Sequence, residues 1–243
     1  MEMSSKNGWK ISTKNGWKLS HIIDFLEKCS CEKIRWFVEC GQLHGLILDM
    51  DYNTITSVMF QFENFTTHDP IHFNIITCQF LKALSSTGRG DILTLEFSND
   101  SVVVIRERVD NSETRCPLPI SIQDCNKNNF HIEHVGPIHN VKTSLLSCLS
   151  KELGSSKPIT FKTLASSTNS LVIETDSLSF YISDTTKIEP RDEIFIETVP
   201  KLLTPWKKTF ANITPMAQVS ISDNNICIFI TDDGWHVKYS WKK

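Results

Sequence analysis

Two stretches about 120 residues apart share one order of predicted elements, and this long-range duplication constrains the fold more than any other feature of the sequence. Residues 78–107 are predicted to form a helix, a loop, a strand, a tight polar turn and a second strand. Residues 200–232 repeat that order, including a polar Ser-Asp-Asn-Asn turn. Each half also has an earlier helix followed by antiparallel strands, at 19–62 and at 141–183. The fold class is therefore predicted to be α+β, with two domains of similar topology.

The domain boundaries follow from this repeat. Residues 8–111 and 131–243 are predicted to be the two domains, and residues 112–130 the connector between them. Residues 1–7 are predicted to be an N-terminal extension.

A short duplication near the start of the chain is local and does not belong to the long-range repeat. The pentapeptide KNGWK occurs at 6–10 and at 14–18 and never again, which excludes an array of short repeats. Alternating residues over 9–14 predict a strand after the first copy. Apolar residues at helical spacing predict a helix over 19–29 after the second copy, with Ser20 as its candidate cap.

Composition limits the class of protein. The chain has 243 residues, of which 40% are hydrophobic and 22% charged, so it can bury a sizeable core. It has no run of eighteen apolar residues, and its first residues lack the apolar segment of a signal peptide. We therefore expect an intracellular protein whose eight cysteines are free thiols, with no membrane partner.

Motifs of enzyme chemistry are absent. The sequence contains no phosphate-binding GxxxxGK[ST], and no GxGxxG, HExxH or GxSxG motif. Cys29 and Cys31 have no second close pair that would complete a tetrahedral zinc site. His131 and His134 are interpreted as structural residues. The sequence therefore predicts no enzyme, no catalytic residue, no metal and no cofactor.

Three blocks of sequence resemble, in order and spacing, the matching stretches of eukaryotic sliding clamps of the proliferating cell nuclear antigen family. They are LILDMDYNTITSVMF, NIITCQFLKALSSTGRGDILTL and FITDDGWHVKYSW, and the resemblance extends from about Trp9 to Trp241. It implies the DNA clamp fold, in which two topologically similar β-α-β domains per subunit close as a six-domain ring in a trimer. Helices would line the hole around duplex DNA.

The resemblance also implies a function. Such clamps have no enzymatic activity; they tether DNA polymerase and other replication and repair proteins, and a clamp loader opens them. The lineage would be divergent, with a viral origin as one alternative. The expected location is the nucleus or a viral replication compartment.

Charge supports a DNA-facing surface on the helices. The predicted helices, at 19–29, 77–85, 138–153 and 199–211, contain seven lysines and three acids, a net charge of +4, whereas the whole chain carries −3. Lysines on an inner wall would bind phosphates without regard to base sequence. The alternative is that helix exteriors carry charge for solubility. The candidate DNA-binding residues are Lys28, Lys82, Lys142, Lys151, Lys201, Lys207 and Lys208.

The resemblance implies a hydrophobic pocket beneath the connector that accepts a short motif of polymerases and nucleases. Core packing is the alternative role for Met50 and Ile55. The connector contains two prolines where the family usually has acidic and apolar residues, so an altered set of partners is an open alternative. The pocket residues would be Met50, Ile55, Leu118, Ile120 and Trp241.

The resemblance further implies that a ring closes by pairing an edge strand at 115–121 with one at 177–183 of the next subunit. Pro117 and Pro119 each remove a backbone donor. If both face outward, the inner hydrogen bonds survive; if not, the ring is weaker or needs a different subunit. The candidate interface residues are Cys116, Leu118, Ile120, Phe180, Tyr181 and Ile182.

Three hypotheses follow. The first is a homotrimeric replication clamp. The second is one subunit of a heterotrimeric DNA-damage checkpoint clamp, and the third is a clamp-fold protein that forms no ring and acts as a scaffold or transcription accessory factor. The oligomeric state of the pure protein separates them.

Overall fold

The computed structural model describes most of the chain. The described residues are 9–29, 33–49, 53–66, 70–122, 136–151, 158–164, 168–175, 178–187, 193–198, 206, 210 and 213–242. The chain forms two compact units, the first made of residues 1–46 and 59–128 and the second of residues 47–58 and 129–243. Residues 112–122 of the predicted connector are described and residues 123–130 are not, and the predicted domain boundaries stay predictions.

Unit 1 contains a five-stranded sheet with the order β5-β1-β7-β8-β9. These strands are β5 (Asn64–Thr66), β1 (Trp9–Thr13), β7 (Ile92–Phe97), β8 (Ser101–Glu107) and β9 (Glu113–Pro119). The other strands of this half of the chain follow one another in the order β10-β6-β2-β3-β4. They are β10 (Ser121–Ile122), β6 (Ile71–Ile76), β2 (Lys33–Glu39), β3 (Gln42–Asp49) and β4 (Thr54–Gln61). Residues 47–49 of β3 and 54–58 of β4 belong to unit 2.

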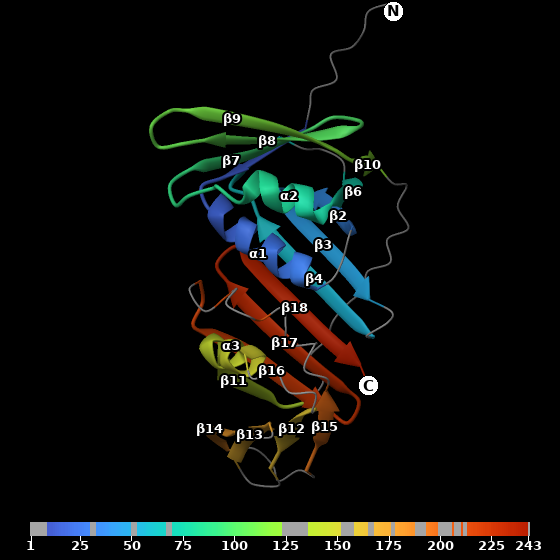
Figure 1. The fold of residues 1–243 in the computed structure, drawn as a ribbon, viewed down its shortest axis with the longest axis vertical. Helices are drawn as coiled ribbons and strands as arrows, with labels where there is room; N and C mark the ends of the chain where they lie inside the picture. The colour runs from blue at the N-terminus through green and yellow to red at the C-terminus, as the bar shows by residue number, and fades with distance from the viewer. Residues whose placement is uncertain are drawn as a thin grey trace, which may run out of the picture. The chain divides into compact units, whose positions relative to one another are not determined.

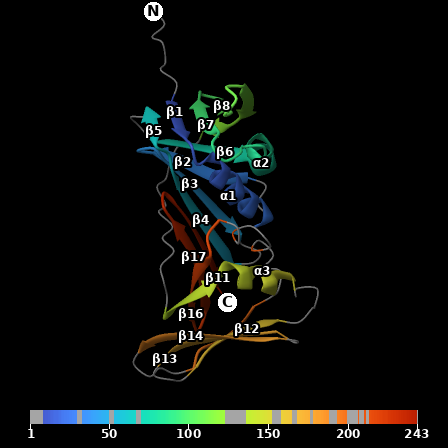
Figure 2. The same ribbon diagram turned by 90° about the vertical axis from the view of Figure 1, so that its left-hand side faces the viewer.

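Two helices cover unit 1 and lie side by side in both views (Figures 1 and 2). Helix α2 (Thr77–Leu84) buries Phe80 and Leu84. Helix α1 (Gly16–Lys28) buries an apolar stripe made of Leu19, Ile22, Ile23, Phe25 and Leu26. Both helices predicted from the sequence are therefore confirmed. Their apolar stripes are packed against the core, and amphipathic helices of this length depend on such packing for stability.

The start of α1 differs from the prediction. The helix begins at Gly16, and Ser20 lies inside it, where its hydroxyl donates to the carbonyl of Trp17 at 3.1 Å. The predicted cap at Ser20 is therefore wrong. A Cβ atom at Gly16 would lie 2.5 Å from Cβ of Leu93 in β7, so glycine lets the helix start against the sheet. The second KNGWK copy thus supplies the turn from β1 into α1.

Unit 2 also combines sheet and helix. One set of strands has the order β18-β17-β16-β11, made of β18 (Trp235–Lys242), β17 (Asn225–Asp232), β16 (Met216–Ser222) and β11 (Ile138–Lys142). A four-stranded sheet has the order β14-β13-β12-β15, made of β14 (Ser179–Lys187), β13 (Thr168–Glu174), β12 (Ile159–Thr163) and β15 (Phe195–Thr198). Helix α3 spans Thr143–Lys151. The predicted α+β class is confirmed.

The helix predicted over 138–153 is wrong at its start. Residues 138–142 form β11, which pairs antiparallel with β16 and buries His139 and Val141 on one face. The physical reason is that five residues are too few for alternation to be separated from a helical pattern. The helix predicted over 199–211 lies outside the described residues except for Trp206 and Phe210. Both are buried, and their rings contact Tyr239 and Trp235 of β18.

Long apolar helices and metal-ligand clusters are both absent from the described residues. None of the helices among them is long and apolar enough to cross a membrane. The same residues include no group of three histidine, cysteine or acidic side chains that could hold a metal ion.

A histidine in the sheet of unit 1 predicts how stability depends on pH. The ring of His44 stacks on Phe37 with centroids 4.2 Å apart, and burial lowers the pKa of His44 below 6.5 although Glu39 opposes the shift. The unfolded chain therefore binds this proton at a higher pH than the folded chain does. We expect the free energy of unfolding to fall as pH is lowered from about 7 to about 5, measured by urea denaturation.

The variant His44→Phe keeps a stacked ring without a titrating group. It should reduce this pH dependence and leave a remainder from His21, whose pKa is also lowered, mainly by burial. An unchanged slope in the variant would show that His44 titrates alike in both states.

Candidate nucleic-acid and subunit interfaces

The described lysines of the candidate DNA-binding set occupy different settings. Lys82 is exposed on α2, and Lys142 is exposed at the end of β11, not in a helix as predicted. Lys28 forms an ion pair with Asp24 one helical turn away, so its charge is compensated locally. Lys151 ends α3, and the remaining three, Lys201, Lys207 and Lys208, lie outside the described residues.

Charge is distributed unevenly among the helices. Helices α2 and α3 each contain one lysine and no acid, whereas α1 contains two lysines and two acids. The predicted excess of lysines over acids is thus present in α2 and α3 and absent from α1. The net charge of +4 predicted for the four helices is therefore corrected, because Lys142 belongs to strand β11 and not to a helix.

Sequence reasoning missed a basic group at the start of α1. The guanidinium of Arg89 lies 4.6 Å from the centre of the Trp17 ring, and Nζ of Lys18 lies 5.9 Å from it. A cation within about 6 Å of the centre of an aromatic face is attracted electrostatically by the ring quadrupole. Helical spacing could have identified Lys18, but the position of Arg89 depends on how its loop folds against α1.

The two strands predicted for ring closure are edge strands. Strand β9 ends the five-stranded sheet, and β14 ends the four-stranded sheet (Figure 1). On β14, Tyr181 is 72% exposed and Phe180 is half-buried. Cys116 is a half-buried free thiol on β9. Their role in a subunit interface stays a prediction.

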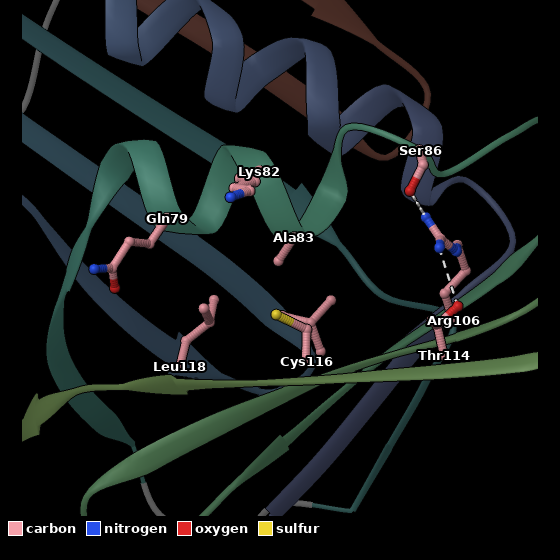
Figure 3. Close-up of a pocket in the computed structure, with 9 residues that line it drawn as sticks. Gln79, Lys82, Ala83, Ser86, Arg106, Thr114, Cys116 and Leu118 are labelled. Carbon is pink, nitrogen blue, oxygen red and sulfur yellow. Dashed lines mark hydrogen bonds between the residues drawn. The ribbon is translucent and has the colours of Figure 1, made fainter.

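An open pocket of about 360 Å³ lies in unit 1 between α2 and the strands β8 and β9 (Figure 3). Lys82 and Ala83 line it from the helix, and Cys116 and Leu118 from β9. The structure thus brings together Lys82, Cys116 and Leu118, which the sequence assigned to different roles.

Arg106 closes one end of this pocket, and sequence reasoning missed it. It is 7% exposed, and its guanidinium donates to the hydroxyl of Ser86 and to that of Thr114, the latter at 3.0 Å (Figure 3). Because α2 ends shortly before Ser86, this arginine connects the end of the helix to β9. It thereby stabilises the pocket walls.

The residues predicted for the partner pocket are divided between the units. Leu118 and Ile120 are buried in unit 1, and the side chain of Leu118 lines the pocket next to α2. In unit 2, Ile55 packs against Cys227 and Phe229, and Trp241 is half-buried in β18. Met50 lies outside the described residues. The partner pocket therefore stays a prediction, and so does the choice between a pocket role and core packing for the half-buried Ile55.

The arrangement of strands and helices is the fold of the DNA sliding clamps. Among solved structures, the proliferating cellular nuclear antigen of Entamoeba histolytica aligns with a TM-score of 0.77 at 13% identity, covering 96% of this chain and 98% of that chain. The PCNA2–PCNA3 complex of Sulfolobus tokodaii aligns with a TM-score of 0.75 at 15% identity over the same shares. The predicted clamp fold is confirmed.

Comparison of sequences alone does not identify the clamp fold. No protein-family model and no curated protein matches the chain. At 13% to 15% identity, the structural likeness shows the fold and leaves the activity to be inferred.

Proposed function

We propose that this protein is a DNA sliding clamp, a polymerase processivity factor that encircles duplex DNA and tethers replication and repair proteins without being an enzyme. The observation that carries the proposal is the match of both units together, over 96% of the chain, to clamps of the proliferating cell nuclear antigen type. The lysines of α2 and α3, with no acid in either helix, are the expected contacts to phosphate. Its partners would be a polymerase and a clamp loader in the nucleus or a viral replication compartment.

A second candidate function is that of one subunit in a heterotrimeric clamp. The observation that favours it is the pair of prolines in the edge strand β9, which reduces the hydrogen bonds that a neighbouring strand can form. One of the similar solved structures is itself a complex of two different clamp chains.

Topological retention on DNA tests the proposal without a loader. A ring threads over the free end of a linear duplex whose other end carries a bound protein block, and a second block is then added. We expect the protein to stay on this doubly blocked duplex through gel filtration in high salt and to leave it once a restriction enzyme cuts the duplex. A ring slides off a free end, whereas a protein bound by contacts alone does not depend on the cut.

The same assay identifies the alternatives. Retention that is insensitive to cutting would contradict encirclement. A monomer with no retention would favour a heterotrimer or a clamp-fold scaffold, and adding the missing subunits would restore retention only in the first case.

A further inference from the structure

Two walls form the open pocket between α2 and β9. One wall belongs to β8 and β9, where residues opposite each other project to the same face of the sheet. Its residues are Val104 with Cys116, Arg106 with Thr114, and Leu118. The other wall belongs to one face of α2 and the turn after it, and its residues are Gln79, Lys82, Ala83 and Ser86. The volume of about 360 Å³ lies within the range of small-molecule sites, roughly 300–1,000 Å³.

Arg106 places a positive charge at one end of this pocket (Figure 3). It follows Val102 and Val104 in the buried row of β8 and is 7% exposed. Its guanidinium donates to the hydroxyls of Ser86 and Thr114, and its Nε has no hydrogen-bond partner among the described residues. None of the described carboxylates forms an ion pair with it. A buried charge without a counter-charge is costly, so a bound anion would stabilise this arginine.

Lys82 adds a second positive charge to the same pocket. It is exposed on α2, and no ion pair joins it to a described carboxylate. Among the described residues that line the pocket, none is an aspartate or a glutamate. Hydrogen bonds between charged groups are shorter and stronger than neutral ones. The lining therefore favours an anion with more than one negative charge.

The two hydroxyls beside Arg106 supply further donors. Ser86 and Thr114 each accept an N–H of the guanidinium, so each keeps its own O–H proton to donate. Neither proton has an acceptor among the described residues. Together with the amide of Gln79 and the ammonium of Lys82, the pocket presents donors from two walls. A phosphate group matches them, because it offers several acceptor oxygens.

The rest of the lining is apolar and aliphatic. Ala83, Val104 and Leu118 line the pocket together with the thiol of Cys116. No aromatic ring is present in the described lining, so a nucleobase would find no stacking partner there. A short aliphatic group would bury its surface against these side chains.

We propose that the pocket between α2 and β9 binds a phosphate monoester with a compact aliphatic body. Arg106 and Lys82 hold the phosphate, whose charge is about −1.5 to −2 at pH 7. A backbone phosphate of DNA has a single charge and organic groups on both sides, so it does not reach the buried Arg106. The site is therefore separate from the proposed contacts to duplex DNA, and its failure would leave the clamp proposal standing.

Calorimetric titration of the full-length protein tests the chemistry of the ligand. We expect butyl phosphate to bind roughly tenfold more tightly than inorganic phosphate, which lacks the aliphatic body. Pentanoate has a similar body but less charge, and it should also bind roughly tenfold more weakly. A peptide with one phosphothreonine should bind more weakly than butyl phosphate, because the pocket has no room for its flanking chain. Absence of butyl phosphate binding at millimolar concentration would overturn the proposal, and tighter binding of the peptide would overturn the assignment to a small molecule.

The thiol of Cys116 reports on the position of the ligand in the unmodified protein. Bound butyl phosphate should slow the alkylation of Cys116 by iodoacetamide roughly fivefold or more, measured by mass spectrometry. Cys78 is exposed on the same helix but does not line the pocket, so its rate should not change. A short DNA duplex should protect neither thiol. Equal protection of both thiols, or protection of Cys116 by the duplex, would contradict a monoester site in this pocket.

Substitutions of the cations complete the test. Lys82→Gln should weaken butyl phosphate binding roughly tenfold, and Arg106→Lys should weaken it as well, because lysine keeps the charge but loses the planar fork of donors. Urea denaturation shows whether Arg106→Lys still folds, and the exposed Lys82 guards the proposal if it does not. Lys10→Gln is the control, since Lys10 is paired with Glu96 outside the pocket. Equal weakening by Lys82→Gln and Lys10→Gln would show that net charge, and not the pocket, governs binding.

Discussion

Replacing Lys82 by glutamate is expected to weaken binding to duplex DNA severalfold for each phosphate that the lysine neutralises, and to lower the slope of log affinity against log salt by about 1 per phosphate. The reason is that Lys82 is exposed on a helix without acids, and none of the described residues forms an ion pair with it. Fluorescence anisotropy of a labelled duplex, titrated at several salt concentrations, measures both quantities. In a trimer the effect is repeated in each subunit.

Two lysines provide matched controls for this change of charge. Lys10 lies on the face of β1 opposite the buried Ile11 and is paired with Glu96 at 3.2 Å, so Lys10→Glu should have little effect on the salt slope. Lys28→Glu should fall between the two, because Asp24 already compensates Lys28. If all three variants weaken binding equally, net charge and not the helix surface governs the interaction. The variant Lys82→Glu/Lys201→Glu/Lys208→Glu extends the test to lysines predicted from sequence.

Replacing Trp36 by alanine is expected to lower the free energy of unfolding by about 3–5 kcal/mol. The side chain is 2% exposed in β2, and its ring meets Phe80 of α2 edge-on with centroids 5.8 Å apart. A Cβ atom at Gly45 would lie 2.6 Å from the indole, which shows how closely the ring covers β3. Removing it leaves a cavity under the helix that carries Lys82. Urea denaturation followed by circular dichroism measures the change.

The indole N–H makes this prediction sharper. Nε1 of Trp36 is buried and has no hydrogen-bond partner among the described residues, so Trp36→Phe removes a buried donor that contributes nothing. That variant should therefore be much less destabilised than Trp36→Ala. As a surface control, Phe65→Ala at the exposed strand β5 should cost about 1 kcal/mol or less. Equal destabilisation by alanine at positions 36 and 65 would contradict the packing role.

The helices show where sequence reasoning succeeds. Helix α2 was predicted within one residue of its observed end, because an apolar stripe and a following polar loop delimit it locally. The short strand β11 was missed, since its buried His139 and Val141 give too little alternation. Ser20 was misplaced as a cap because the helix starts where Gly16 meets Leu93, a contact between residues far apart in the chain.

The candidate site residues also differ in whether the sequence alone could predict them. The exposed lysine on α2 and the edge strands β9 and β14 were predicted from local pattern and from resemblance. Arg106 was not, because an arginine inside an apolar strand has no sequence signal that distinguishes a pocket wall from an ordinary strand residue. Its partners Ser86 and Thr114 come from two other elements.

The sequence by itself determined the α+β class, the doubled pattern of elements and the presence of two prolines at a spacing of two in β9. These depend on periodicity and on residue chemistry, which are local properties. Only the tertiary structure decided that both prolines face the open edge and that Cys116 and Leu118 face α2. The direction of a strand's backbone groups reverses with a shift of one residue in its pairing, and that register is set by the partner strand and the turn between them.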